Sequence, residues 1–379
     1  MINICCVTGT RADYPRIRSV LKILKDDGDF NLQLIVTGSH LLEDYGNTID
    51  EIKEDGFRID KTVPMYIENF DTPHGMTRCV AHAMAGLADA YQELQPDIML
   101  ITVDRVETLA AASAAALMNL PIFHVQGGEV TGTIDESIRH AVTKLSHVHF
   151  AATEGAKRRI IQMGEPEEDV HNTGCPYIDE LASYDYVSKD VLAKQYGISF
   201  TKSTVILTLH SVTTEFEKSF SQISEVLDAL KKFDVDILAI YSNADAGGKK
   251  IIDLLKKQTG MTLIPNIKSS HFASLMKNCD VMVGNSSAGI REAPFFGLPV
   301  VNIGSRQNGR ERGVNVLDCD FKSKEIANCI HKALFDSSFR KKINGMKNIY
   351  GDGKSANRIV NLIKNKVEKG INVQKLITY

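Results

Sequence analysis

The sequence predicts an α/β protein with two doubly wound, Rossmann-like domains that face a cleft. Short apolar runs alternate with helical patterns along the chain, which is typical of βαβ units and a parallel sheet. The 379 residues are also too many for one ordinary domain. The alternation is interrupted once, near the middle, and then restarts. Together these observations favour two domains of the same architecture.

Five runs in the first half are expected to be buried parallel strands, because each is short and almost wholly apolar. They cover residues 2–7, 31–36, 98–102, 122–125 and 147–151. Helical periodicity fills the intervals, over residues 78–94, 107–119 and 134–146. This alternation predicts a parallel sheet with helices on both faces.

The pattern loosens over residues 173–203, where Gly174, Pro176 and Gly197 punctuate a mixed segment. Strands are expected again over residues 204–209, 237–241, 262–264, 281–283 and 299–302. We therefore place the first domain over residues 1–185 and the second over residues 186–355. The C-terminal segment 356–379 opens with a helical pattern and is expected to pack back onto the first domain.

The composition excludes several classes of protein. A net charge of -3 offers no basic surface, so nucleic acid is not expected as a partner. No apolar run approaches the roughly 20 residues that span a bilayer, and the chain opens in a strand with no leader. Seven cysteines without a CxxC pair indicate neither a disulfide framework nor a zinc site. We expect a cytoplasmic protein without membrane contact or bound metal.

The most informative stretch is residues 126–140, which follows an apolar strand, turns through two glycines and opens a helix. It carries Gln126, Glu129 and Asp135, while Asp104 and Arg105 follow the preceding strand. Ligands of open α/β sheets bind at this carboxyl edge. Clustered carboxylates can hold one member protonated and another ionised, as acid–base chemistry requires. A simpler interpretation exists, because residues 133–136 form a capping box. It favours capping for Glu136 and leaves Asp135 open.

The second half carries a candidate phosphate-binding loop over residues 281–292. Ser286 and Ser287 fall at the start of a helix, where free backbone N–H groups favour a phosphate. Glu292 follows in the same helix and could bind ribose hydroxyls. The alternative is an ordinary N-cap serine and a solvated glutamate. The surrounding segments favour the phosphate interpretation.

Other polar residues are expected at the same sheet edges. Arg306 lies in a loop with two further arginines, a composition that suits a diphosphate or a solvated surface loop. His210 ends a strand, where it could steady a diphosphate or be structural, and Asn243 ends the next one. Arg11 follows the first strand in a loop that is not GxGxxG, so no dinucleotide fingerprint is present.

These segments together resemble the hydrolysing UDP-N-acetylglucosamine 2-epimerases, from the first strand to about residue 317. The segments are Arg11-Ala-Asp13, Asp104-Arg105, Gly127-Gly128-Glu129, Asp135, Arg139-His140, His210, Asn243, Gly284-Asn-Ser-Ser287 and Arg306. The resemblance implies the two-domain fold shared with many nucleotide-sugar glycosyltransferases (GT-B-like). It also implies elimination of UDP, addition of water and release of N-acetylmannosamine for sialic-acid synthesis.

The resemblance assigns roles as well. Asp104, Glu129 and Asp135 would be acids or bases, and His210 would assist beside the phosphates. No redox cofactor is implied, the partner is a UDP-sugar, and relatives are commonly homodimers or homotetramers. The residues that would hold the nucleotide are Arg11, Arg105, Asn243, Ser286, Ser287, Glu292 and Arg306.

Several residues depart from the family pattern, among them Ser211 and Ser242 where prolines are usual and Pro15 after the first loop, and two of the departures lie beside the candidate carboxylates. Gln126 stands where a catalytic glutamate is usual, and an amide cannot exchange a proton near neutral pH. Val103 replaces a glycine just before Asp104. Either another carboxylate performs the missing step, or turnover is slow, or the substrate differs.

Three alternatives therefore remain. A sister enzyme would act on a 2,4-diacetamido-2,4,6-trideoxy sugar nucleotide of the legionaminic-acid pathway, with uracil or guanine as the base. A different class would be a GT-B glycosyltransferase, which lacks the acidic cluster. The third would be a catalytically weak homologue that binds UDP-sugars, an alternative motivated by Gln126 alone.

Overall fold

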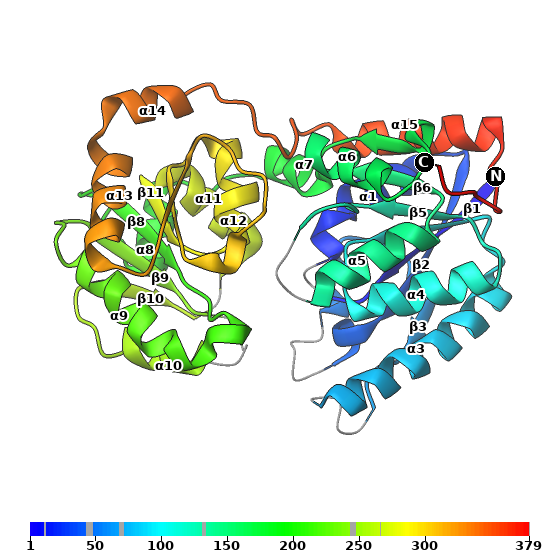
Figure 1. Ribbon diagram of the computed structural model, residues 1–379, viewed down its shortest axis with the longest axis horizontal. Helices are drawn as coiled ribbons and strands as arrows, with labels where there is room; N and C mark the ends of the chain where they lie inside the picture. Colours follow the sequence, from blue (N-terminus) through cyan, green and yellow to red (C-terminus); the bar gives the residue numbers. More distant parts are fainter. Residues whose placement is uncertain are drawn as a thin grey trace. The chain divides into compact units, whose positions relative to one another are not determined.

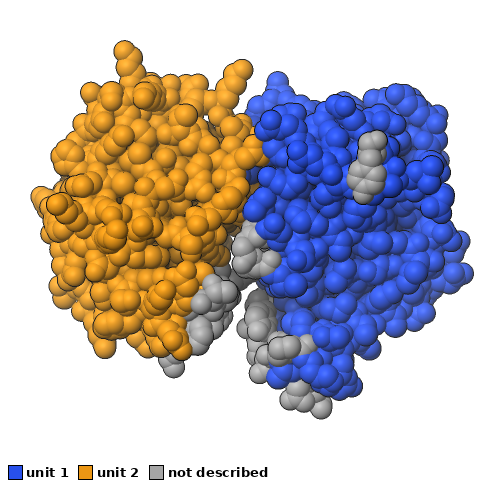
Figure 2. Space-filling model, in the orientation of Figure 1, with its two compact units in different colours: residues 1–182, 350–379 blue, residues 183–349 orange. Residues whose placement is uncertain are grey.

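The computed structural model describes residues 1–10, 13–42, 48–67, 72–130, 134–242, 248–265 and 267–378. The chain forms two compact units, shown in Figure 2. Unit 1 consists of Met1–Ala182 with Tyr350–Tyr379, and unit 2 of Ser183–Ile349. Each unit is described by itself.

Unit 1 is built on a seven-stranded sheet in the order β3-β2-β1-β4-β5-β6-β7, with every neighbouring pair parallel (Figure 1). The order reverses between β1 and β4, which is the topological switch point where such sheets bind ligands. The strands are β1 (Ile2–Thr8), β2 (Phe30–Thr37), β3 (Lys61–Val63), β4 (Ile98–Thr102), β5 (Ile122–Val125), β6 (Val148–Ala151) and β7 (Val170–Asn172).

Successive residues of a strand point to opposite faces, so β1 contributes to two cores. Ile4 and Cys6 of β1 join one cluster, whereas Cys5 and Val7 join the other. Helices α1 (Arg18–Asp26) and α15 (Ser355–Lys369) contribute to the first cluster, and α3 (Pro73–Leu94), α4 (Val106–Leu117) and α5 (Ile134–Leu145) to the second. The remaining helices are α2 (Ile49–Glu54), α6 (Glu154–Gln162) and α7 (Pro176–Ser183), with 3-10 turns η1 (Tyr14–Arg16), η2 (Gly38–Leu41) and η4 (Glu167–Asp169).

The C-terminal helix α15 packs against α1 within unit 1. Its start is held by Asp179, whose carboxylate accepts from the backbone N–H groups of Ser355 at 3.0 Å and Ala356 at 2.6 Å. Ile359 and Ile363 then lie in the same core as the apolar face of α1. The segment after the helix also stays on unit 1, because Thr378 N donates to Gly164 O at 3.0 Å.

Unit 2 is built on a six-stranded sheet in the order β10-β9-β8-β11-β12-β13, again parallel throughout. Its order reverses between β8 and β11. The strands are β8 (Thr204–Thr208), β9 (Asp236–Ile240), β10 (Met261–Ile264), β11 (Val281–Gly284), β12 (Val300–Ile303) and β13 (Val316–Cys319). The helices are α8 (Lys189–Tyr196), α9 (Ser219–Leu230), α10 (Gly248–Leu255), α11 (Ser269–Asn278), α12 (Ser287–Arg291), α13 (Ser323–Phe335) and α14 (Ser337–Ile343), with 3-10 turns η5 (Thr213–Lys218), η6 (Ala293–Phe296) and η7 (Ser305–Gln307).

The predicted fold class, two doubly wound parallel sheets, is confirmed. Three strands were not predicted: β3, β7 and β13. Each lies at the edge of its sheet and has three or four residues, so its apolar pattern is too short to stand out. Within the described ranges, no helix combines the length and apolarity needed to cross a membrane.

Candidate active site

The carboxyl ends of the neighbouring strands β4 and β5 carry two residues with left-handed backbone, Val103 at φ 59° and Gln126 at φ 67°. This conformation strains a β-branched residue, and such strain clusters at functional sites. Two hydrogen bonds hold Val103 in place: its N–H donates to Val125 O at 3.0 Å, and its carbonyl accepts from His124 Nε2 at 2.9 Å. Burial lowers the pKa of His124 to about 3, so this donor is a neutral imidazole. Asp104 is therefore presented from a fixed, strained turn.

Asp104 is paired with Arg139, a fully buried arginine of α5. The guanidinium of Arg139 also donates from Nη1 to the carbonyl of Glu129 at 2.6 Å. One buried cation thus ties the end of β4 to the glycine turn after β5. Arg139 therefore brings Asp104 and the backbone of Glu129 together.

Gln126 is buried, and its amide group is bonded at both ends. The Oε1 atom accepts from Arg16 Nη1 at 3.2 Å, and Nε2 donates to Cys175 Sγ at 3.1 Å. The side chain therefore has a defined orientation at the sheet edge. An amide at this position cannot titrate.

Asp135 lies half-buried in the first turn of α5. Asp135 interacts electrostatically with Arg105. Burial lowers the pKa of the Arg105 guanidinium, but negative charges, first that of Glu107 and then that of Asp135, act against burial, and the pKa is raised overall. Glu136 lies 3.7 Å from His140, one turn along the same helix. The predicted capping box includes Thr133, which lies outside the described residues.

In unit 2, Asn285 holds His210 against the loop that follows β11. The Oδ1 atom of Asn285 accepts from His210 N at 2.8 Å, and its Nδ2 donates to His210 O at 2.8 Å. The approach is possible because Gly284 has φ 135° and no side chain, since a Cβ there would collide with the carbonyl of Thr208. The strand ends of β8 and β11, which flank the switch point, are thereby locked together.

Arg306 lies beside the pair formed by Asn285 and His210. The carbonyl of Asn285 accepts from Arg306 Nη1 at 3.1 Å and from Gln307 Nε2 at 2.9 Å. Burial, and then the charge of Arg306, lowers the pKa of His210 to about 4. The imidazole is therefore neutral near pH 7 in a positive field, an environment that suits a diphosphate.

Ser286 is the N-cap of α12, and its Oγ accepts from Ala288 N at 3.4 Å. The helix has only five residues, so the free N–H groups of its first turn matter more here than a helix dipole. Glu292 follows directly and is buried, not solvated. Its Oε2 accepts no hydrogen bond from the described residues, which suits an acceptor for ribose hydroxyls.

Comparison with known proteins agrees with this arrangement. The family model described as UDP-N-acetylglucosamine 2-epimerase matches residues 22–364. The chain belongs to this epimerase family.

Two curated relatives and one solved structure illustrate the likeness. The chain is 40% identical over 365 residues to the UDP-N,N'-diacetylbacillosamine 2-epimerase (hydrolyzing) of Legionella pneumophila, covering 96% of this chain and 95% of the relative. It is 35% identical over 335 residues to a UDP-N-acetylglucosamine 2-epimerase of Neisseria meningitidis, covering 88% of each. The crystal structure of UDP-GlcNAc 2-epimerase from Neisseria meningitidis bound to UDP-GlcNAc has the same fold, with a TM-score of 0.84, 21% identity, and coverage of 96% of this chain and 100% of that one.

Two predicted nucleotide-binding residues of this epimerase-family chain, Arg11 and Asn243, lie outside the described residues. Of the three arginines in the loop over residues 304–313, Arg312 is engaged within the loop. This residue pairs with Asp318 and donates from Nε to Arg310 O at 3.1 Å, so it stabilises the loop itself.

Sequence reasoning missed two residues that organise the site, Arg139 and Asn285. Both fall inside the motifs that were singled out. Arg139 stands one helical turn after Asp135, and that spacing could have suggested that the two share a face. No spacing rule predicts that Asn285 turns its side chain towards His210, 75 residues earlier in the chain.

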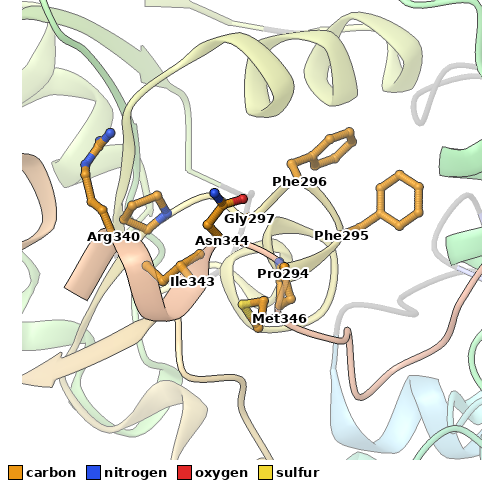
Figure 3. Close-up of a pocket in the computed structure, with 10 residues that line it drawn as sticks. Pro294, Phe295, Phe296, Gly297, Arg340, Ile343, Asn344 and Met346 are labelled. Atoms are coloured by element: carbon orange, nitrogen blue, oxygen red, sulfur yellow. The ribbon is translucent and has the colours of Figure 1, made fainter. Parts of the chain in front are cut away.

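Unit 2 also has a hollow of about 490 Å³ (Figure 3). It is lined by η6 and by the end of α14, including Phe295, Phe296 and Met346. None of the predicted site residues lines it. The hollow therefore does not bear on the epimerase chemistry.

Proposed function

We propose that this epimerase-family chain is a hydrolysing 2-epimerase of UDP-linked 2-acetamido sugars. The observation that carries the proposal is the 40% identity, over 96% of the chain, to a relative named as a hydrolysing 2-epimerase. Unit 1 would carry the acid–base residues, and unit 2 would hold the nucleotide. We further propose a cytoplasmic homodimer or homotetramer that supplies sialic-acid-type sugar synthesis.

The first half-reaction would eliminate UDP. A carboxylate takes the proton on C2, the bond from C1 to the diphosphate oxygen breaks, and a C1=C2 double bond forms. Stabilising the departing diphosphate is essential because C2–H is a weak acid. Arg306, neutral His210 and the N–H groups after Ser286 are suited to that task. Glu292 would orient the ribose.

The second half-reaction would add water across the double bond. The water oxygen bonds to C1, a carboxylate takes its proton, and C2 receives a proton on the face that inverts its configuration. Two titrating groups are therefore needed, and Gln126 is not one of them. Asp104, Glu129 and Asp135 are the predicted candidates. The products would be UDP and the free 2-epimeric sugar, with no redox cofactor or metal.

Two sugar nucleotides are candidates for the substrate. The original prediction is UDP-N-acetylglucosamine, giving N-acetylmannosamine. The alternative is a UDP-linked 2,4-diacetamido-2,4,6-trideoxy sugar, which is favoured by the higher identity to the Legionella relative, 40% against 35%.

Proton NMR in deuterated water tests the proposal with both sugar nucleotides in parallel. The expected result is release of UDP and of the free 2-epimer with deuterium at C2 from one of them. Release of UDP only when an acceptor is added would identify a glycosyltransferase instead. Binding of UDP with no turnover of either substrate would indicate a weak homologue.

A further inference from the structure

Glu107 occupies the topological switch point of unit 1. It stands in the first turn of α4, directly after β4, and β4 pairs with β1 where the strand order reverses. Its side chain packs against the backbone of two loops that follow β1 and β2. A Cβ added at Gly9 would lie 2.7 Å from Glu107 Cγ, and one added at Gly38 would lie 2.9 Å from it. Two glycines thus leave space for this carboxyl group at the ligand-binding edge.

The burial of Glu107 is unusual for its position in a helix. An acid in a first helical turn gains a small stabilisation from the helix dipole, and it can do so while exposed. Glu154, in the first turn of α6, is such an exposed acid. The side chain of Glu107 is only 1% exposed. Desolvating a carboxylate costs more free energy than the helix dipole returns, so the dipole alone does not account for its location.

The carboxyl group of Glu107 is only partly satisfied. Oε1 accepts from Tyr66 OH at 3.0 Å, whereas Oε2 is buried and accepts no hydrogen bond from the described residues. The nearest cation is Arg105, whose Nε lies 4.0 Å from Oε2. A buried polar atom without a hydrogen bond points to a missing partner, either a proton or a ligand.

Burial of Glu107 favours a proton on its carboxyl group. Burial raises the pKa of Glu107. Arg105, the residue's own backbone N–H and the hydroxyl of Tyr66 oppose the rise, whereas the like charge of Asp13 adds to it. Arg105 is shared, because Asp135 also acts on it electrostatically. Glu107 and Asp135 are therefore two carboxyl groups that act on the same arginine, Glu107 from a buried position and Asp135 from a half-buried one. Such divergence is how paired carboxyl groups divide the roles of acid and base.

We propose that Glu107 is a further acid–base residue of the site, which supplies the proton that Gln126 cannot. This role rests on the proposed function. When water adds to C1, a proton of that water passes to Asp135. The C1=C2 electron pair takes the proton of the Glu107 carboxyl group, which is left ionised. Exchange with solvent then restores both groups.

The test uses Glu107→Gln, which keeps the side-chain shape and an acceptor for Tyr66 but cannot titrate. Turnover is expected to fall at least about 100-fold, the lower range for loss of a general acid, with UDP affinity unchanged within about threefold. The matched control is Glu154→Gln, a first-turn acid that is exposed, and it should leave turnover unchanged. Retention of more than a tenth of the turnover by Glu107→Gln would overturn the proposal.

A second variant, Tyr66→Phe, tests whether the Glu107 carboxyl group carries the proton that is transferred. Removing the hydroxyl deletes a donor to the ionised carboxylate, so the pKa of Glu107 should rise further. The alkaline limb of the turnover profile should then shift to higher pH. An unchanged limb would contradict the role even if Glu107→Gln proved poorly folded.

Carbon-13 NMR of glutamate carboxyl groups separates this proposal from the proposed function. The Glu107 signal is identified by its absence in Glu107→Gln, and it should titrate above the ordinary value of about 4.3. It should also shift when the sugar nucleotide binds. A shift without turnover would overturn the hydrolysing function but keep Glu107 in the sugar site. If the protein turns over the substrate but the Glu107 signal does not shift on binding, only the inference about Glu107 would be overturned.

Discussion

The side chain of Asn285 binds the backbone of His210 in both directions, accepting from its N–H and donating to its carbonyl at 2.8 Å each. These two residues follow β11 and β8, the strands on either side of the switch point of unit 2. One amide group therefore sets the distance between the candidate phosphate loop and the candidate histidine. Its own carbonyl also orients Arg306.

Asn285→Asp is expected to weaken UDP binding by at least about tenfold, roughly 1.4 kcal/mol. The carboxylate still accepts from His210 N, but it cannot donate to His210 O and it brings a negative charge to a diphosphate site. Isothermal titration calorimetry measures the loss. The control is Asn278→Asp in α11, which also loses a side-chain donor to a backbone carbonyl, that of Ser274 at 2.7 Å. Equal effects in both variants would remove the special role of Asn285.

The lowered pKa of His210, about 4 against an ordinary 6.5, makes stability depend on pH. Between these values the unfolded chain binds a proton that the folded chain does not, so the free energy of unfolding should rise as pH increases from 4 to 6.5. His210→Gln should reduce this slope. It should not abolish it, because buried His124, with a pKa of about 3, contributes in the same direction. Denaturant unfolding at several pH values measures the slope.

UDP should change the titration of His210 itself. The diphosphate adds negative charge beside the imidazole, which favours its protonated form. Nitrogen-15 NMR should therefore show a higher pKa for His210 in the UDP complex than in the free protein. An unaltered titration curve at saturating UDP would place the diphosphate elsewhere.

Gln126→Glu should change turnover by less than about tenfold if Glu107 supplies the proton, since the site then already has its acid. The new carboxylate can pair with Arg16, but it loses the donor to Cys175. Thermal unfolding serves as the control for stability. A rise in turnover of two orders of magnitude or more would show instead that Gln126 disables an otherwise complete site.

Val103→Gly should have little effect on stability, within about 1 kcal/mol, because relief of left-handed strain offsets the lost apolar burial. The matched control is Val125→Gly, a buried valine at the end of β5 that is not among the residues with positive φ. It should destabilise the protein by about 2–4 kcal/mol. Equal losses in denaturant unfolding would mean that Val103 is not strained.

Most of the fold could be predicted from local pattern. The central strands of both sheets are largely buried, so their sequences are mostly apolar runs. The edge strands β3, β7 and β13 were missed because they are too short to show such a pattern. The site positions at strand ends were also predictable, since parallel strands bring their carboxyl ends to one edge. Their roles in the reaction remain predictions.

The chain's amino-acid order by itself determined the alternation of strands and helices, the glycine turn before α5 and the small residues before α12. These depend on side-chain size and polarity within a few residues. Only the tertiary structure decided which polar groups are buried and what they touch. Glu107 is an ordinary first-turn acid in the sequence, yet Gly9 and Gly38 enclose it from two other strand ends. Burial and charge environment depend on residues that are distant along the chain, so they could not be predicted from its local pattern.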